Sequence, residues 1–225
     1  PLFSHIILAD EINRTPPKTQ AALLEAMQEK TVTTSGKTYA LKQPFFVLAT
    51  QNPIEQEGTY PLPEAQLDRF LMHVNVDYPD AETEAAILNL ARGEARQEQQ
   101  KDVFTPISQK SIFAAREEIL DLHMAGNIEA YLLQIILATR NPGAYDESLG
   151  KWLQYGASPR ATIALDRCAR AHAWLDGRDF VGPEDIQSIA FDVLRHRVLL
   201  SYEAEAEGIT PDRFIEALLS RIAVP

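Results

Sequence analysis

The hydrophobic pattern of this chain changes its period near residue 79. Before that point short apolar runs alternate with helical segments, and the runs lie at 6–9, 45–49 and 71–76. Such runs are typical of strands buried on both faces of a parallel sheet. After that point only helical patterns remain. The sequence therefore predicts an α/β core with a parallel sheet over residues 1–79, followed by an all-helical unit over residues 80–225.

Start and turn signals place the other elements. Thr15-Pro16-Pro17 predicts the start of a helix that ends near Glu29, and the Ser35-Gly36 turn predicts a hairpin over 31–41. A short helix is expected over 63–70, and the polar stretch 93–102 is expected to be an exposed connection. Longer helices are predicted at 80–92, 109–122, 127–140, 158–175, 183–199 and 211–222.

The charge balance narrows the classes of function. The 225 residues include 21 Lys+Arg against 32 Asp+Glu, a formal net charge of −11. Unspecific nucleic-acid binding is disfavoured, because phosphate contacts need clustered positive charge. The one cysteine, Cys168, cannot form an internal disulfide, and no apolar run approaches the ~20 residues of a membrane helix. We therefore expect a cytoplasmic protein without a membrane segment.

Two adjacent carboxylates follow the first apolar run. Asp10 and Glu11 come directly after Ile6–Ala9, at the end of a strand where open α/β sheets bind ligands. One carboxylate can hold Mg²⁺, directly or through its water, and the next can polarise an attacking water. A solvated strand end or a helix-capping pair is the alternative interpretation.

Three further side chains are candidates for the same chemistry. Asn52 follows Phe45–Ala49, so a parallel sheet would place it at the same edge, where it could bind a γ-phosphate or simply cap the turn before Pro53. Arg69 ends the short helix and is either an arginine finger or an ordinary helix-end charge. Arg160 lies in the first turn of a helix, where the helix dipole disfavours a cation. An arginine at this position indicates either an anionic partner or a side chain that extends into solvent.

In their order, these motifs resemble the AAA+ ATPases, and within them the MoxR family, over essentially the whole chain. The stretches that carry the resemblance are Ile6–Arg14, Ala49–Pro53, Gly58–Phe70, Ser158–Arg160 and Leu194–Arg197. The resemblance implies the second part of a P-loop NTPase core of the AAA+ type, followed by a helical lid.

The resemblance also implies a role for each candidate. Asp10 looks like the Walker B residue that holds Mg²⁺, and Glu11 looks like the residue that activates water. Asn52 is similar to sensor 1, and Arg160 is similar to sensor 2, which reaches from the lid to the phosphates. Arg69 is similar to the arginine finger, which acts in a neighbouring subunit. The implied cofactors are ATP and Mg²⁺, with Asp10, Glu11, Asn52 and Arg160 as the binding residues.

One motif of the family is missing from these residues. No glycine precedes Lys-Ser/Thr at the spacing of a phosphate loop, and Gly36-Lys37-Thr38 falls in the hairpin turn without the upstream glycine. In the family that loop precedes the Walker B strand, and here Pro1–His5 leads straight into this strand. We therefore expect a fragment without the N-terminal Walker A part, which alone neither binds ATP well nor turns it over.

The leading functional hypothesis is an ATP-driven machine of the MoxR type. The resemblance implies a closed homo-oligomeric ring, expected as a hexamer, in which each active site lies between two subunits. It also implies protein clients that are remodelled in a chaperone-like manner, and a von Willebrand A domain protein as a partner.

Two other functions remain open from the sequence. The hairpin looks like the pre-sensor-1 insertion that faces the ring pore, and a DNA or RNA motor would use Lys30, Lys37, Lys42 and Tyr39 there. The net charge of −11 argues against that motor. A non-catalytic, nucleotide-sensing interaction module would fit the missing phosphate loop, and the presence of Glu11 argues against it for the parent protein.

Several polar residues are expected to be structural. Cys168 lies in mid-helix among apolar neighbours and is expected to be a core thiol, and His5 has no partner at metal-ligand spacing. His196 and Arg197 match the family pattern, but a packing or surface role explains them equally well.

Overall fold

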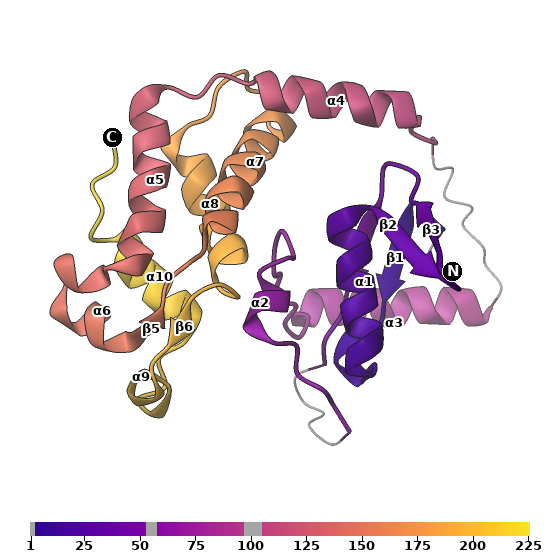
Figure 1. Ribbon diagram of the computed structural model, residues 1–225, viewed down its shortest axis with the longest axis horizontal. Coiled ribbons are helices and arrows are strands. Elements are labelled where there is room, and N and C mark those ends of the chain that lie inside the picture. Colours follow the sequence, from indigo (N-terminus) through magenta and orange to yellow (C-terminus); the bar gives the residue numbers. More distant parts are fainter. Residues whose placement is uncertain (1–2, 53–57, 97–104) are drawn as a thin grey trace. The chain divides into compact units, whose positions relative to one another are not determined.

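The computed structural model describes residues 3–52, 58–96 and 105–225 (Figure 1). Its contacts divide the chain into two compact units, one made of Pro1–His73 with Ile119–Pro225 and the other of Val74–Glu118. The first unit holds the sheet and the large helical cluster. The division after residue 79 that the sequence suggests stays a prediction.

The second unit contains α3 (Ala81–Ala95) and most of α4 (Gln109–Asp121), which lie where the sequence predicts helices. Asp80 caps α3, because its carboxylate accepts a hydrogen bond of 2.8 Å from the backbone N–H of Thr83. The expected connection over 93–102 is wrong at its start, where α3 continues to Ala95, and its residues from 97 on lie outside the described part.

The first unit begins with two parallel strands, β1 (Ile6–Ala9) and β4 (Phe46–Ala49), which pair in register from Ile6 with Phe46 to Ala9 with Ala49. The chain between them forms α1 (Pro17–Glu29) and an antiparallel hairpin of β2 (Thr31–Thr34) and β3 (Lys37–Ala40). These elements confirm the predictions for this region. Because the strands are parallel, their carboxyl ends share one edge.

The two faces of this small sheet differ. Ile7 and Val47 pack with Ala26 of α1, so α1 covers one face. The side chains on the other face are 50–66% exposed, and they are Ile6, Leu8, Phe46 and Leu48. The expected burial on both faces is therefore wrong for β1 and β4, since within this unit α1 covers only one of them.

The third predicted strand, over 71–76, is also wrong. The described backbone is not a strand there, and the backbone N–H of His73 instead donates to the carbonyl of Asp192 at 2.8 Å. A strand needs a neighbour that completes its ladder of hydrogen bonds, and among the described residues the parallel sheet consists of β1 and β4 alone. An apolar run by itself does not supply that neighbour.

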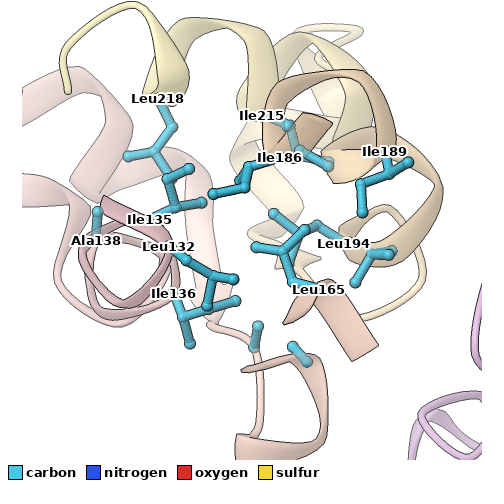
Figure 2. Packing of buried hydrophobic residues seen from close by; sticks show 14 of the residues in the cluster. Leu132, Ile135, Ile136, Ala138, Leu165, Ile186, Ile189, Leu194, Ile215 and Leu218 are labelled. Atoms are coloured by element: carbon cyan, nitrogen blue, oxygen red, sulfur yellow. The ribbon is translucent and has the colours of Figure 1, made fainter. Parts of the chain in front are cut away.

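The helical cluster of the first unit is the larger core. It is built by α5 (Gly126–Arg140), α7 (Pro159–Leu175), α8 (Pro183–Leu194) and α10 (Pro211–Leu219). Figure 2 shows side chains from these helices meeting in one cluster, among them Ile135, Leu165, Leu194 and Leu218. Cys168 belongs to the same cluster, which confirms it as a core thiol, and burial raises the pKa of this thiol to about 11.

Short elements in this cluster depart from the prediction of helices alone. The helix expected over 183–199 ends at Leu194, and β6 (Leu199–Leu200) pairs antiparallel with β5 (Leu153–Tyr155). The sequence also gives no signal for η1 (Ile12–Arg14), η2 (Pro142–Ala144), α6 (Glu147–Trp152) and α9 (Tyr202–Ala206). Elements of two to six residues are too short to show a period of their own.

The segment before His73 contains α2 (Glu64–Leu67), which is shorter than the helix expected over 63–70. Asp68, Arg69 and Phe70 continue it as turns, through backbone bonds to the carbonyls of Glu64, Gln66 and Leu67. This segment ends against the turn that follows α8, and that contact forms part of the site described next.

Candidate functional site

The carboxyl edge of the sheet brings Asp10 and Glu11 against Thr50, the first residue after β4. The Thr50 hydroxyl donates to Asp10 Oδ1 at 2.6 Å and accepts from the backbone N–H of Glu11 at 2.8 Å. The backbone of Thr50 bonds the same turn twice, with Ala9 O at 3.0 Å and with Ile12 N at 2.9 Å. The end of β4 therefore fixes the Asp10 carboxylate and the backbone of Glu11.

Glu11 has a backbone conformation that is uncommon for a residue with a side chain. Its φ of 47° and ψ of 55° lie in the left-handed region, where only glycine fits without strain. The bonds from Thr50 hold it there. Its carboxylate turns to Arg14, whose Nε lies 2.9 Å from Oε2, and both side chains are partly exposed. A strained residue in a polar sheet edge is typical of a functional site.

Asn52 lies two residues beyond Thr50, past the same end of β4, and is partly buried. The structure thus places Asn52 after the edge that carries Asp10 and Glu11, as the sequence predicts. Thr50 itself is a residue of this candidate site that sequence reasoning missed. The signal available in the sequence was a hydroxyl residue directly after the apolar run 45–49.

A buried amide ties this turn to the segment that contains α2. Gln20 of α1 is 1% exposed, and its Nε2 donates to the carbonyl of Ile12 at 3.1 Å and to the carbonyl of Tyr60 at 3.0 Å. The backbone N–H of Tyr60 also donates to Asn13 O at 2.6 Å. The turn after β1 and the segment leading to Arg69 are therefore held together.

Asp68 connects this segment to the helical cluster. Its Oδ2 accepts from the hydroxyl of Ser158 at 2.8 Å, and its Oδ1 accepts from Arg197 Nε at 2.9 Å. The side chain of Arg197 is 2% exposed and also donates to the backbone carbonyls of Asp68, Phe70 and Leu71. Of the two roles considered for Arg197, the surface role is therefore wrong and the packing role is confirmed. Its guanidinium is buried and joins two parts of the chain.

Burial lowers the pKa of two neighbouring side chains in this turn, Arg197 and His196. Burial lowers the pKa of Arg197, while the Asp68 carboxylate opposes that effect. Burial and the adjacent Arg197 charge lower the pKa of His196 to about 3, so this imidazole is neutral at neutral pH. Its Nε2 lies 3.2 Å from the carbonyl of Phe70, which requires the proton on Nε2 and leaves Nδ1 as a buried acceptor without a partner.

Arg69 and Arg160 line one open groove of about 400 Å³, together with Arg167 and side chains of α1 and β4. The Arg160 guanidinium reaches Gln28 Oε1 at 3.4 Å, and the guanidinium of Arg69 bonds no residue that the structure describes. Among the described lining residues Asp68 is the single carboxylate, and Arg197 and Ser158 already engage it. The groove therefore presents uncompensated positive charge, which suits a phosphate group.

The predicted residues thus fall into two groups. Asp10, Glu11 and Asn52 lie at the sheet edge, while Arg69 and Arg160 line the groove. The donor set at the edge fits Mg²⁺, because carboxylate and hydroxyl oxygens of Asp10 and Thr50 are the hard ligands that this ion prefers. The groove supplies cations for phosphates. The glycine-rich loop that would complete a nucleotide site is not among these 225 residues.

The parallel strand pair with its acidic carboxyl edge, and the helical unit that follows it with an arginine in a capped first turn, are the two parts expected of a member of the AAA class. Family models agree with this assignment. The model described as "ATPase family associated with various cellular activities (AAA)" matches residues 1–72, and the "AAA lid domain" matches residues 151–218.

Within that class the chain belongs to the MoxR family. All of it aligns with the chaperone MoxR1 of Mycobacterium tuberculosis at 42% identity, over 59% of that protein. It is 44% identical to the protein YeaC of Bacillus subtilis, over 67% of that protein, and 32% identical to the protein MoxR of Methylorubrum extorquens, over 66%. The chain thus spans about three fifths to two thirds of the length of these relatives.

Solved structures show the same fold. The crystal structure of a protein from Cytophaga hutchinsonii matches with a TM-score of 0.93 and 47% sequence identity. The match covers all of this chain and 68% of the Cytophaga chain. A full-length MCM homologue from Methanopyrus kandleri has a TM-score of 0.54 at 22% identity, which shows a shared fold alone. None of the helices in the described ranges is long and apolar enough to cross a membrane.

Proposed function

We propose that the protein to which these residues belong hydrolyses ATP and uses the energy to remodel other proteins. The observation that carries the proposal is the pair Asp10 and Glu11, fixed by Thr50 at the carboxyl edge of a parallel sheet in a chain of the MoxR family. Two carboxylates on adjacent residues at that edge could serve two functions, because one would hold the metal and the other would accept a proton from the attacking water.

The proposed roles follow from the chemistry of each group. Asp10 would hold Mg²⁺, directly or through a water molecule, and the ion when bound would neutralise charge on the phosphate oxygens. Glu11 would accept the proton of the attacking water, once its carboxylate leaves Arg14. Asn52 would orient that water or bind the γ-phosphate. Arg160 would contact the phosphates from the helical lid.

Arg69 would complete the active site of a neighbouring subunit. Its guanidinium is exposed and bonds no described residue of its own chain, as expected for a group that acts on another molecule. An arginine supplied in this way raises phosphoryl-transfer rates by about 10³–10⁵. We therefore propose a closed homo-oligomeric ring, a hexamer, as the active form.

The chaperone name of the relative MoxR1 supports protein clients as the target of the work. A protein with a von Willebrand A domain is our proposed partner, and it comes from the family resemblance alone. The structure gives little support to the alternative of a nucleic-acid motor, which needs clustered positive charge on the hairpin. Lys37 is the one lysine within the β2–β3 hairpin, and the Nζ of Lys30 lies 5.6 Å from the centre of the Phe45 ring.

The test is steady-state ATP hydrolysis by the full-length gene product and by its Glu11→Gln variant. We expect kcat to fall at least about 100-fold, because a general base contributes about 10²–10⁴. Nucleotide binding, measured by titration with a fluorescent ATP analogue, should be kept. Glu29→Gln is the matched control, since Glu29 is an exposed acid at the end of α1, and it should hydrolyse ATP as the wild type does.

If the full-length protein binds ATP but does not hydrolyse it at any protein concentration, the proposal is wrong and a nucleotide-sensing scaffold becomes the better description. Unchanged turnover in Glu11→Gln would remove Glu11 from its proposed role. The 225-residue chain by itself serves as a further control, because it lacks the phosphate loop and should show neither ATP binding nor turnover.

A further inference from the structure

We infer that Asp68 is a positioning residue, which makes the placement of Arg69 depend on the first turn of α7 that carries Arg160. The inference rests on the proposed function, in which Arg69 acts on the neighbouring subunit and Arg160 on the nucleotide of its own subunit. Asp68 does not touch the nucleotide in this account. It acts through Arg69, the next residue in the chain.

The support of Arg69 comes only in part from its own helix. The helix before it, α2, has four residues, and an isolated helix of that length has little stability of its own. The segment from Asp68 to Leu71 is instead held by Arg197, which donates to three of its backbone carbonyls and to the Asp68 carboxylate. The position of Arg69 therefore depends on the helical cluster as well as on the backbone bonds of its own turn.

A single hydroxyl links the two arginines. Ser158 caps α7, and its Oγ accepts from the backbone N–H of Arg160 at 3.1 Å. The same Oγ donates to Asp68 Oδ2 at 2.8 Å. The path from Arg160 to Arg69 thus runs through one serine hydroxyl and one carboxylate. A shift of the α7 terminus, when Arg160 engages or releases an anion, must either move Asp68 or break this bond.

The ion pair between Asp68 and Arg197 is largely buried. Arg197 is almost fully buried and the Asp68 side chain is 19% exposed, so water does not readily replace either partner. A paired charge in such a place is costly to separate, which makes the connection stiff. Each subunit would therefore report the state of its own nucleotide to the active site of its neighbour.

The test uses Asp68→Asn in the full-length protein, alone and mixed with Glu11→Gln subunits. The amide keeps the size of the side chain but removes the charge that holds Arg197. We expect kcat to fall about 100-fold with KM for ATP little changed, the loss that a misplacement of about 1 Å can cause. In mixed rings the Glu11→Gln subunits have an inactive site of their own but supply an intact Arg69 to their neighbours. The mixture should therefore regain activity well above the sum of the two variants.

Arg69→Ala mixed with Glu11→Gln is the reference, because the proposed function predicts the same recovery for it. If that reference mixture does not recover, Arg69 does not act on the neighbour, and both the proposed function of Arg69 and this inference fail. If the reference recovers but the Asp68→Asn mixture does not, Asp68 acts on its own subunit or only on its fold. The inference alone then fails.

A second variant covers the case in which Asp68→Asn does not fold. Ser158→Ala removes the hydroxyl that bonds Asp68, and Ser201→Ala is its matched control. Ser201 also caps a helix, accepting from the Ala204 N–H at 3.2 Å, but it has no contact with Asp68. We expect Ser158→Ala to lower kcat and to recover with Glu11→Gln, while Ser201→Ala hydrolyses ATP normally. Equal effects of the two serine variants would overturn the inference.

Discussion

His196 is the residue whose protonation departs furthest from its ordinary behaviour. Burial and the neighbouring Arg197 charge lower its pKa to about 3, against 6.5 for a free imidazole. Between pH 6.5 and pH 3, His196 is therefore protonated in the unfolded chain and neutral in the folded chain. It follows that the free energy of unfolding falls as the pH falls from about 6.5 to about 3, by close to 1.4 kcal/mol per pH unit.

We predict that His196→Gln removes this loss. Glutamine can still donate to the carbonyl of Phe70, but it does not titrate, so the slope of stability against pH between 6 and 4 should become flatter. Urea unfolding at a series of pH values measures the slope. His123→Gln, at an exposed position, is the control and should keep the slope of the wild type. Identical slopes in wild type and His196→Gln would contradict the prediction.

The sequence predicts the location of some of these side chains but not of others. The location of Asp10, Glu11 and Asn52 past the ends of two paired strands was predictable, because each lies within three residues of an apolar run and parallel strands end at one edge. Arg197 was not predictable as a buried cross-link. A charged residue after a helical pattern is ordinarily solvated, and only its distant partner Asp68 makes burial tolerable. That partner lies 129 positions away in the chain, so no local pattern reveals it.

At the level of elements, the corner between α7 and α8 depends on one buried carboxylate. Asp185 is fully buried and accepts from Arg178, from the backbone N–H of Gly182 at 2.8 Å, and pairs with His172 Nδ1 at 2.7 Å. Burial alone would raise the pKa of Asp185, but these bonds lower it to about 2. His172, Asp176 and Asp185 could in principle hold a cation, yet the Arg178 guanidinium already fills that position.

We predict that Asp185→Asn lowers the free energy of unfolding by about 3 kcal/mol at pH 7, because it leaves Arg178 without its buried partner. The folded pKa of Asp185 lies below its ordinary value, so this contribution is present above about pH 4 and is lost as the pH falls toward 2. Chemical denaturation at pH 7 and at pH 3 measures both effects. Asp176→Asn, an exposed partner of the same arginine, should cost less than about 1 kcal/mol. A loss for Asp185→Asn that is as small as that of the control would contradict the prediction.

The elements that the sequence missed share a physical cause. The run over 71–76 has the composition of a strand, but strand formation depends on a neighbour that composition does not reveal. The ribbon of β5 and β6 joins residues about fifty positions apart with only a few ladder bonds. The starts of helices with clear caps, such as the one that Ser158 begins, were predicted to within one or two residues because the signal is local.

At the scale of the whole molecule, stability is concentrated in the helical cluster. Its core includes many fully buried side chains, whereas one face of the β1–β4 sheet is open. We predict that Ile135→Ala, in α5, lowers the free energy of unfolding by about 2–5 kcal/mol, while Ile6→Ala changes it by less than about 0.5 kcal/mol. Ile135 is 0% exposed and Ile6 is 66% exposed, so the pair is matched in chemistry and differs in burial. Equal losses, measured by denaturant unfolding, would show that the sheet face is covered in solution.

The buried thiol of Cys168 has a practical consequence for observing this protein at work. With a pKa of about 11, only about one thiol in ten thousand is a thiolate at pH 7, so it reacts very slowly with maleimide dyes. Cys168 is the one cysteine of these 225 residues, so a cysteine introduced at the exposed Ser35, in the tip of the hairpin, could carry a fluorophore without any change to the native thiol. Site-specific labelling of this chain therefore needs one added cysteine and no removal of a native one.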